Sequence, residues 1–483
     1  MFCSAALSLK QFTALCFVLL VLWPLNGWSQ TAALTQQAAM RLEPGRPIER
    51  ELALDQEHIF RLRLEAGQCA RIEVEQRGVN LVLNLLAPDE KMIFWMDDEW
   101  GYEGTEQALL IAPVSSEYTL LIGPRITSPV APKPGKYEVR LTEVRQATEQ
   151  DQQRYRTQLL YSDATGKIYT GRDEKEKAQG AAMAQEWLRL PRTQGDEKLR
   201  ANLLWILAVD YFYSLTFAYK QSNDYLREAA ELYRQIGNQP QLGRSLHLLA
   251  FNHKTMGEFS TAVSYEQQAL TVWRESGDRS QEVGALEMLG EFTASLGNDE
   301  QALAYYEQAV QIAHEINDPV TEAAALTSLG SFYGWMRDPE KAIECKQRAI
   351  RLAQAAGNKL LEARLLDQLT DELAVQQGFY NRSALLRARS SLAPRIVEML
   401  ERSRALLREL NYEIEAGPLT TLAGWYAIQG DRRAALEAIE RVTKLTESWS
   451  PNAKAGIKTY LTFAWGELGD EQKVFELTEQ AQW

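Results

Sequence analysis

A recurrence of small residues every 40 positions is the feature that most constrains what this chain can fold into. Gly257 recurs at Gly297, and Gly277 is followed at the same spacing by Asn317 and Gly357. Recurrence at a fixed period of about 20–50 residues is typical of a solenoid, in which each unit packs on its neighbours. We therefore expect an open array of repeated units in this region rather than one closed globule.

Each repeated unit also carries small residues separated by 12 and then by 7 positions. The three sets are Ala250, Ala262 and Ala269; Gly290, Ala302 and Ala309; and Gly330, Ala342 and Ala349. Small side chains at such points let two antiparallel helices approach closely and let the next pair dock on them. The spacing predicts helical hairpins whose second helices end near Gly277, Asn317 and Gly357.

The segment Leu329-Gly330-x2-Tyr333 carries the closest resemblance to a known repeat. It resembles the tetratricopeptide repeat (TPR), whose first helix has a Leu-Gly-x2-Tyr core and whose second helix has spaced alanines. The unit here is about 40 residues rather than the usual ~34, which we interpret as a longer second helix. The resemblance implies an all-α TPR solenoid over residues 150–483, with the clearest repeats at 241–360.

Residues 40–146 show a different pattern, with apolar residues at every second position. The alternation is clear in Phe60–Leu64, Ala70–Val74 and Tyr137–Leu141, whereas Val79–Leu86 is more continuously apolar. Successive side chains of a strand point to opposite faces, so each alternating segment buries one face and exposes the other. Short strands at this spacing predict an N-terminal antiparallel β-sandwich.

The two regions together resemble a bacterial family of exported TPR proteins with an N-terminal prepeptidase-like β-domain. The resemblance is carried by Leu42–Leu52 and Pro134–Leu141, with the repeats behind them. Many such relatives continue into a caspase-like (CHAT) protease domain, and we find no place for one after the repeats. One alternative is therefore a regulatory part of a CHAT-type protease system whose catalytic domain is lost or separate.

Residues 1–29 have the pattern of a secretory signal peptide. A basic start precedes the almost wholly apolar segment Phe12–Leu25, and small or turn-forming residues follow it up to Ser29. This apolar segment is shorter than the ~20 residues that span a bilayer. We expect cleavage near Ser29, an exported protein, periplasmic or secreted, and no membrane span after cleavage. Cys69 and Cys345 then remain, and we expect two packed thiols rather than a disulfide.

The charge balance and the motifs limit the chemistry that the chain is expected to perform. Its 483 residues include 52 Lys and Arg against 65 Asp and Glu, a net charge of −13, which argues against a nucleic-acid partner. There is no nucleophile elbow, no phosphate-binding Gly-rich loop and no zinc-binding His-Glu-x-x-His. We predict a non-enzymatic scaffold with no catalytic residues, cofactor or metal, and leave the oligomeric state open.

A stacked array offers a concave surface lined by its first helices, and this is where we expect a partner to bind. Positions 287 and 291 lie one helical turn apart, and the equivalent positions in the neighbouring units share their face. The candidate partner-binding residues are Phe251, Glu287, Glu291, Asp367 and Asp371. They favour a basic or extended peptide, and the alternative is that they are solvated acids of an acidic protein.

Two further segments could bind ligands. Trp95, Asp97, Asp98 and Trp100 could hold a carbohydrate or a cation, although an edge strand with a solvated loop explains them more simply. A second segment is rich in arginine and could dock an acidic partner or the protein's own acidic surface. Its arginines are Arg382, Arg387, Arg389, Arg395, Arg402, Arg404 and Arg408.

Overall fold

The computed structural model describes most of the chain beyond the predicted signal peptide, which lies outside the described residues. The described residues are 39–53, 56–97, 103–124, 135–171, 173–190, 196–213, 218–376, 392–410, 415–447 and 451–480. The chain divides into two compact units, Met1–Met256 and Gly257–Trp483. Within the described ranges, no helix has the length and apolar character needed to cross a membrane.

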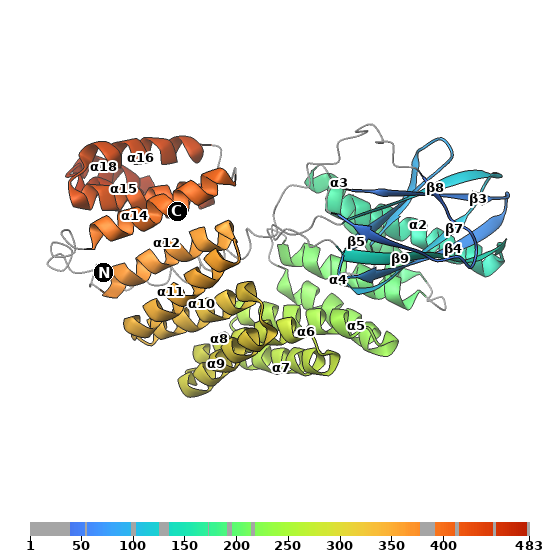
Figure 1. The fold of residues 1–483 in the computed structure, drawn as a ribbon, viewed down its shortest axis with the longest axis horizontal. Coiled ribbons are helices and arrows are strands. Elements are labelled where there is room, and N and C mark those ends of the chain that lie inside the picture. The colour runs from blue at the N-terminus through green and yellow to red at the C-terminus, as the bar shows by residue number, and fades with distance from the viewer. Residues whose placement is uncertain are drawn as a thin grey trace. The chain divides into compact units, whose positions relative to one another are not determined.

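Two β-sheets form the start of the first unit (Figure 1). Their strands are β1 (Met40–Arg41), β2 (Ile48–Leu52), β3 (His58–Leu64), β4 (Gln68–Arg77), β5 (Leu81–Leu86), β6 (Met92–Met96), β7 (Glu103–Ile111), β8 (Ser116–Pro124) and β9 (Gly135–Gln146). The strand orders are β1-β3-β8-β5-β6 and β2-β9-β4-β7. Neighbouring strands are antiparallel except for the short β1, which pairs in parallel with β3. The predicted sandwich is confirmed, with this one parallel edge added.

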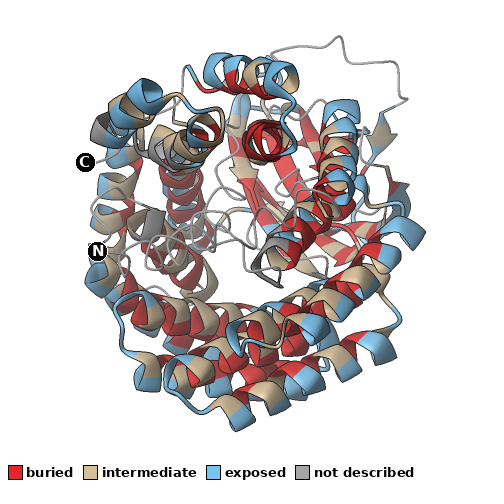
Figure 2. Cartoon of the chain, turned by 90° about the vertical axis from the view of Figure 1, so that its left-hand side faces the viewer, coloured by how far each residue is buried: buried red, intermediate tan, exposed pale blue. Residues whose placement is uncertain are grey.

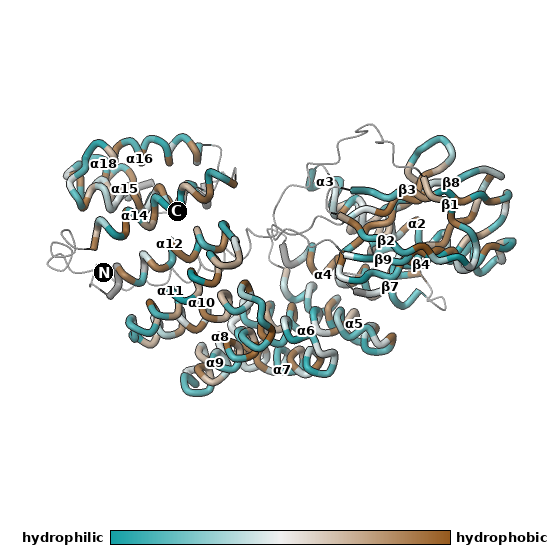
Figure 3. The backbone as a smooth tube through the Cα atoms, in the orientation of Figure 1, coloured by the Kyte–Doolittle hydropathy of each residue, from teal (hydrophilic) through white to brown (hydrophobic). Residues whose placement is uncertain are grey.

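The alternation in the sequence explains which faces of the strands are buried. Along β4, Ala70, Ile72 and Val74 are fully buried, whereas Arg71 and Glu73 between them are partly exposed. Figure 3 shows hydrophobic and hydrophilic residues alternating along the strands. The buried side chains of both sheets form one hydrophobic core.

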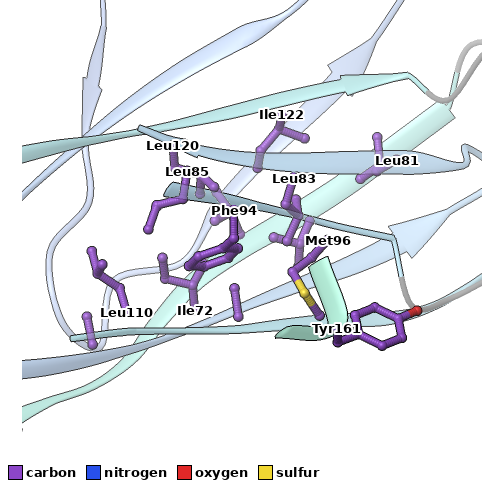
Figure 4. Close-up of a cluster of buried hydrophobic side chains, with 14 of the residues drawn as sticks. Ile72, Leu81, Leu83, Leu85, Phe94, Met96, Leu110, Leu120, Ile122 and Tyr161 are labelled. Atoms are coloured by element: carbon purple, nitrogen blue, oxygen red, sulfur yellow. The ribbon is translucent and has the colours of Figure 1, made fainter. Parts of the chain in front are cut away.

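Helix α2 (Glu149–Thr170) contacts one outer strand of each sheet, β6 and β7. The Gln158 amide pairs with the Leu109 backbone of β7: its Oε1 accepts from the amide N at 2.9 Å, and its Nε2 donates to the carbonyl O at 3.0 Å. Ser162 Oγ accepts from the backbone N of Trp95 on β6 at 3.0 Å. Tyr161 lies beside Met96 in the core (Figure 4). An edge strand left uncovered would expose unpaired backbone groups, and α2 satisfies some of them.

The first helices belong to the same packed body as the sheets. They are α2, α3 (Glu174–Arg189), α4 (Glu197–Tyr213), α5 (Tyr219–Ile236) and α6 (Gln239–Thr255). Trp187 of α3 and Leu203, Ile206 and Leu207 of α4 lie in the hydrophobic core that the sheets form. The strands end at Gln146 and the helices begin three residues later, but the two kinds of structure share one core.

The second unit consists of packed helices, and those up to Gln376 follow the 40-residue register. They are α7 (Phe259–Ser276), α8 (Arg279–Ser295), α9 (Asp299–Ile316), α10 (Pro319–Trp335), α11 (Pro339–Ala355), α12 (Lys359–Gln376), α14 (Ala393–Glu409), α15 (Ala416–Gln429), α16 (Arg432–Leu445), α17 (Pro451–Glu467) and α18 (Glu471–Gln480). Gly277, Asn317 and Gly357 all have left-handed backbone, with φ of 72°, 59° and 65°. The predicted register and the predicted ends of the second helices are confirmed.

The small residues at the 12-and-7 spacing lie where helices meet. Gly290, Ala302, Ala309, Gly330, Ala342 and Ala349 are all buried. Figure 2 shows that the buried positions of the helices gather on the sides where they pack together. Residues 377–391 lie outside the described part of the chain, and α14 resumes the helices at Ala393.

Candidate functional site

The candidate acids of the second unit lie on two of its first helices, α8 and α12. Glu287 and Glu291 of α8 and Asp367 of α12 are partly buried, and Ser331 at the equivalent position of α10 is exposed. Asp371 lies on α12, but its side chain is outside the described part of the chain. Ser328 of α10 donates a hydrogen bond from Oγ to Glu287 Oε1 at 2.6 Å. This bond shows that Glu287 faces the seam between the first helices of adjacent repeats, hereafter the α8–α10 seam.

Glu287 has an unusual electrostatic setting. Its side chain is partly exposed to solvent, and the neighbouring protein groups desolvate the carboxyl group. This burial raises the pKa of Glu287 to about 7, and the hydrogen bond from Ser328 opposes the rise only in part. The protonated form of the Glu287 carboxyl group is therefore favoured relative to that of an exposed glutamate.

An aromatic row leads from the interior to the surface next to these acids. Tyr306 of α9 is buried, and its ring centroid lies 5.1 Å from that of Phe332 of α10. Phe332 in turn stacks on Trp335 at 5.8 Å, and Trp335 is 50% exposed. Burial, followed by the charges of Glu291 and Glu287, raises the pKa of Tyr306. Trp335 is one turn beyond Ser331 on α10, so a large aromatic side chain is available on the face of the candidate acids.

The seam between α10 and α12 is built differently, from an ion pair. Lys346 Nζ of α11 lies 2.6 Å from Glu372 Oε1 of α12, and the lysine side chain is only 5% exposed. A Cβ added to Gly334 of α10 would lie 2.9 Å from the same carboxylate oxygen, so the three helices meet tightly here. Sequence reasoning missed this pair. The sequence did carry a sign of this ion pair, because Lys346 stands at the position that Tyr306 occupies one repeat earlier.

A second recurring row of acids is structural. Glu282, Glu322 and Glu362, again 40 residues apart, are buried at the first turns of α8, α10 and α12. The basic partners of these acids are Arg274 at 2.8 Å and Arg279 at 2.9 Å for Glu282, His314 at 3.1 Å and Arg348 for Glu322, and Arg402 at 2.6 Å for Glu362. A surface hollow of about 620 Å³ borders Arg274, Arg279 and Glu315. Its two arginines are engaged by the chain's own carboxylates.

Phe251 lies on α6 in the other compact unit and is described with that unit alone. It is partly buried, and Lys254 Nζ lies 5.1 Å from the centroid of its ring. The structure therefore gives Phe251 a local cation–π contact.

The aromatic-acidic segment of the β-region is packed against α2 where the structure describes it. The Trp95 indole N–H donates to the carbonyl O of Ser162 at 3.1 Å, and its ring meets Tyr169 edge-on at 6.3 Å. Asp97 is only 2% exposed, and Asp98 and Trp100 lie outside the described residues. Trp95 thus joins β6 to α2, a packing role that does not favour the carbohydrate or cation alternative.

Three of the four described arginines of the arginine-rich segment pair with the chain's own acids, and the fourth, Arg395, is exposed. Arg402 pairs with Glu362 at 2.6 Å, and Arg404 and Arg408 reach Glu415 at 3.3 Å and 2.7 Å. Arg382, Arg387 and Arg389 lie outside the described residues. The cysteines also lie in packed settings: Cys69 is buried, Cys345 is partly buried, and both are free thiols.

Comparisons with known proteins concern the helical repeats. The family described as tetratricopeptide repeat matches residues 282–354. A search of curated proteins gave no match.

The chain is also similar to several solved structures, at low identity and with TM-scores below 0.5. BtubC (BKLC) from P. vanneervenii is 18% identical, with a TM-score of 0.41, over 48% of this chain and 92% of that one. The signal-transduction ATPase with a tetratricopeptide repeat sensor from Pyrococcus horikoshii is 15% identical, with a TM-score of 0.43, over 64% and 46%. A Rap protein complexed with competence and sporulation factor is 13% identical, with a TM-score of 0.41, over 68% and 85%. This chain is a multidomain protein in which N-terminal β-sheets precede a TPR-like helical solenoid.

Proposed function

We propose that this protein is an exported, non-enzymatic scaffold that binds a protein or peptide partner on the inner face of its helical array. We define the inner face by its described residues: Glu287, Glu291, Thr327, Ser331, Trp335 and Asp367. The observation that carries the proposal is that the first helices α8, α10 and α12 present polar or acidic groups at equivalent positions of the register. Stacked repeats of this kind bind partners along such surfaces.

The chemistry of the inner face favours a partner segment that is basic and carries an apolar or aromatic side chain. Glu287 and Glu291 on α8 and Asp367 on α12 supply negative charge to this face. Trp335, half exposed and stacked on Phe332, supplies a rigid aromatic surface of the kind that dominates binding energy at protein interfaces. A long positively charged side chain can use both, because its stem packs on the ring while its head meets a carboxylate.

Export and the identity of the β-region belong to the same proposal. The pattern of residues 1–29 supports cleavage of a signal peptide, and the intact mass of the exported protein would test it. The phrases at Leu42–Leu52 and Pro134–Leu141 support a prepeptidase-like domain. Because α2–α4 share the core of the sheets, we propose that the β-region holds the first helices in place as one body.

Capture experiments with the full chain would test the scaffold function. We expect Ser331→Arg to abolish capture of the partner, because a long cation would fill the middle of the inner face. Arg351→Glu on α11 is the matched control, since Arg351 is exposed and lies outside the inner face as defined. Equal capture by wild type and Ser331→Arg would contradict binding at the inner face.

A further inference from the structure

Glutamates with little exposed surface in the second unit are mostly held by cations of the chain itself. Five of them have an Arg, Lys or His partner: Glu282, Glu322, Glu362, Glu372 and Glu415. Glu287 is different, because its only hydrogen-bond partner within the described residues is the neutral hydroxyl of Ser328. A buried carboxylate without a cation is costly, so Glu287 is stabilised either by binding a proton or by the approach of a cation.

The groups around Glu287 supply no positive charge to its carboxyl group. Glu291 lies one turn further along α8. Tyr306 of α9 is close enough for the charges of Glu291 and Glu287 to raise its pKa. From α10, Ser328 donates its hydrogen bond to Glu287. Over the described residues, only burial and the Ser328 hydroxyl shift its pKa, which lies at about 7. Neither Glu291 nor Tyr306 can supply a positive charge. A cation that satisfies the carboxylate must therefore come from outside these groups.

We propose that Glu287 is the docking point for a cationic side chain of the partner, a lysine ammonium or an arginine guanidinium, and that docking expels the proton of the Glu287 carboxyl group. The inference rests on the proposed scaffold function, and it names Glu287 as the group that sets the specificity of partner binding. The protonated carboxyl gives its proton to solvent, and the resulting carboxylate pairs with the ammonium or guanidinium beside Ser328. Such charge-assisted pairs are stronger than neutral hydrogen bonds.

The proton release fixes the direction of the pH dependence. Below pH 7 the carboxyl must lose a proton before it can pair, so the affinity for a cationic partner rises as the pH rises. For one group with a pKa near 7, this linkage amounts to about a tenfold gain in affinity between pH 6 and pH 8. A lysine ammonium stays charged throughout this range.

Binding of a defined probe to the full chain would test the inference. The probe is a fluorescent decapeptide of alternating lysine and alanine, and the same peptide with acetylated lysines is its neutral counterpart. We expect the wild type to bind the lysine peptide about tenfold more tightly at pH 8 than at pH 6, and to bind the acetylated peptide weakly at both. Calorimetry in two buffers of different ionisation enthalpy should show the release of about one proton at pH 6.

Two variants separate a specific contact from the general attraction of an acidic protein. Glu287→Gln retains an acceptor for Ser328 but carries no charge, and we expect it to lose the pH dependence and bind at least tenfold more weakly at pH 8. Glu275→Gln makes the same charge change at an exposed position of α7 and should bind as wild type does. Circular dichroism of both variants would confirm that they are folded.

Two outcomes would overturn the inference. The first is binding of the lysine peptide that Glu287→Gln leaves unchanged. The second is an equal loss of binding in Glu275→Gln, which would mean that only net charge matters. Either result leaves the scaffold function to be judged separately by partner capture with Ser331→Arg, so failure of the two proposals can be told apart.

Discussion

Gly290 and Tyr306 lie in direct contact at the point where α8 crosses α9. A Cβ added to Gly290 would lie 2.8 Å from two carbons of the Tyr306 ring, closer than carbon atoms can approach. The φ of Gly290 is not in the left-handed region, so the nearby Tyr306 ring, and not the backbone conformation, favours glycine at this position. The contact explains in atomic terms why the smallest residue stands at this position of α8.

Replacing Gly290 by alanine should destabilise the second unit. The added methyl group forces the Tyr306 ring or one helix to move, and overpacking of this kind costs about 1–3 kcal/mol. Chemical denaturation followed by helical circular dichroism would measure the loss. Gly284→Ala on the same helix is the matched control, because nothing lies within 4 Å of its added Cβ. Gly284→Ala should stabilise the protein by about 0.5–1 kcal/mol, because alanine is more favourable than glycine inside a helix. Equal effects of the two changes would contradict the packing described here.

Replacing Gln158 by methionine should weaken the joint between α2 and the sheet. The change leaves the backbone N–H and carbonyl of Leu109 without the partners that Gln158 provides, at a cost of about 1–3 kcal/mol for a buried group. Hydrogen exchange at the Leu109 amide should become faster. Gln153→Met, at an exposed position of α2, should leave both stability and exchange unchanged. Unchanged exchange in Gln158→Met would show that the pairing contributes nothing.

Much of the fold could be predicted from local pattern. The alternation of apolar residues at every second position predicted the strands around Phe60–Leu64 and Ala70–Val74. The 40-residue register predicted the ends of α7 and α9. The role of α2 could not be predicted this way, because Gln158 and Ser162 look like ordinary polar residues of a helix. Their importance comes from contact with strands about 50 and 67 residues away, which no local pattern encodes.

Replacing Lys346 by methionine should be strongly destabilising. The change leaves the nearly buried Glu372 carboxylate without its cation, and breaking such a pair from one side costs about 3 kcal/mol. The double change Lys346→Met with Glu372→Gln should recover most of this loss. Arg433→Met, which breaks an exposed pair with Glu437, should cost less than about 1 kcal/mol. A small effect at Lys346, similar to that at Arg433, would contradict the burial of the pair.

The stability of the protein should depend on pH through Glu287. The pKa of Glu287 is raised in the folded state, so its contribution is fully present below about pH 4 and is lost as the pH rises to about 7. Glutamine does not titrate, so the Glu287→Gln variant does not lose stability at this position as the pH rises. Relative to wild type, the variant should therefore gain about 2 kcal/mol of stability on going from pH 4 to pH 8, a value reduced for partial exposure. Denaturation at the two pH values would show it, and parallel curves for the two proteins would contradict a raised pKa.

The candidate site was predictable only in outline. The register placed Glu287, Glu291 and Asp367 on equivalent first helices, because helical period and repeat length fix which face a residue occupies. It could not show that Glu287 faces Ser328 while the next seam is closed by Lys346 and Glu372. Which residues of adjacent repeats meet depends on the packing between them. Trp335 was missed for the same reason, since its exposure depends on what surrounds the end of α10.

Site-specific photocrosslinking tests the central claim, that the inner face holds a partner, most directly. A benzoylphenylalanine placed at Ser331 of the full chain should form one discrete adduct with the partner, while the same group at Arg351 should form none. The lysine-alanine decapeptide in excess should suppress the adduct at Ser331 if the partner uses the same face. Adducts that form equally from both positions, or only from Arg351, would contradict binding at the inner face.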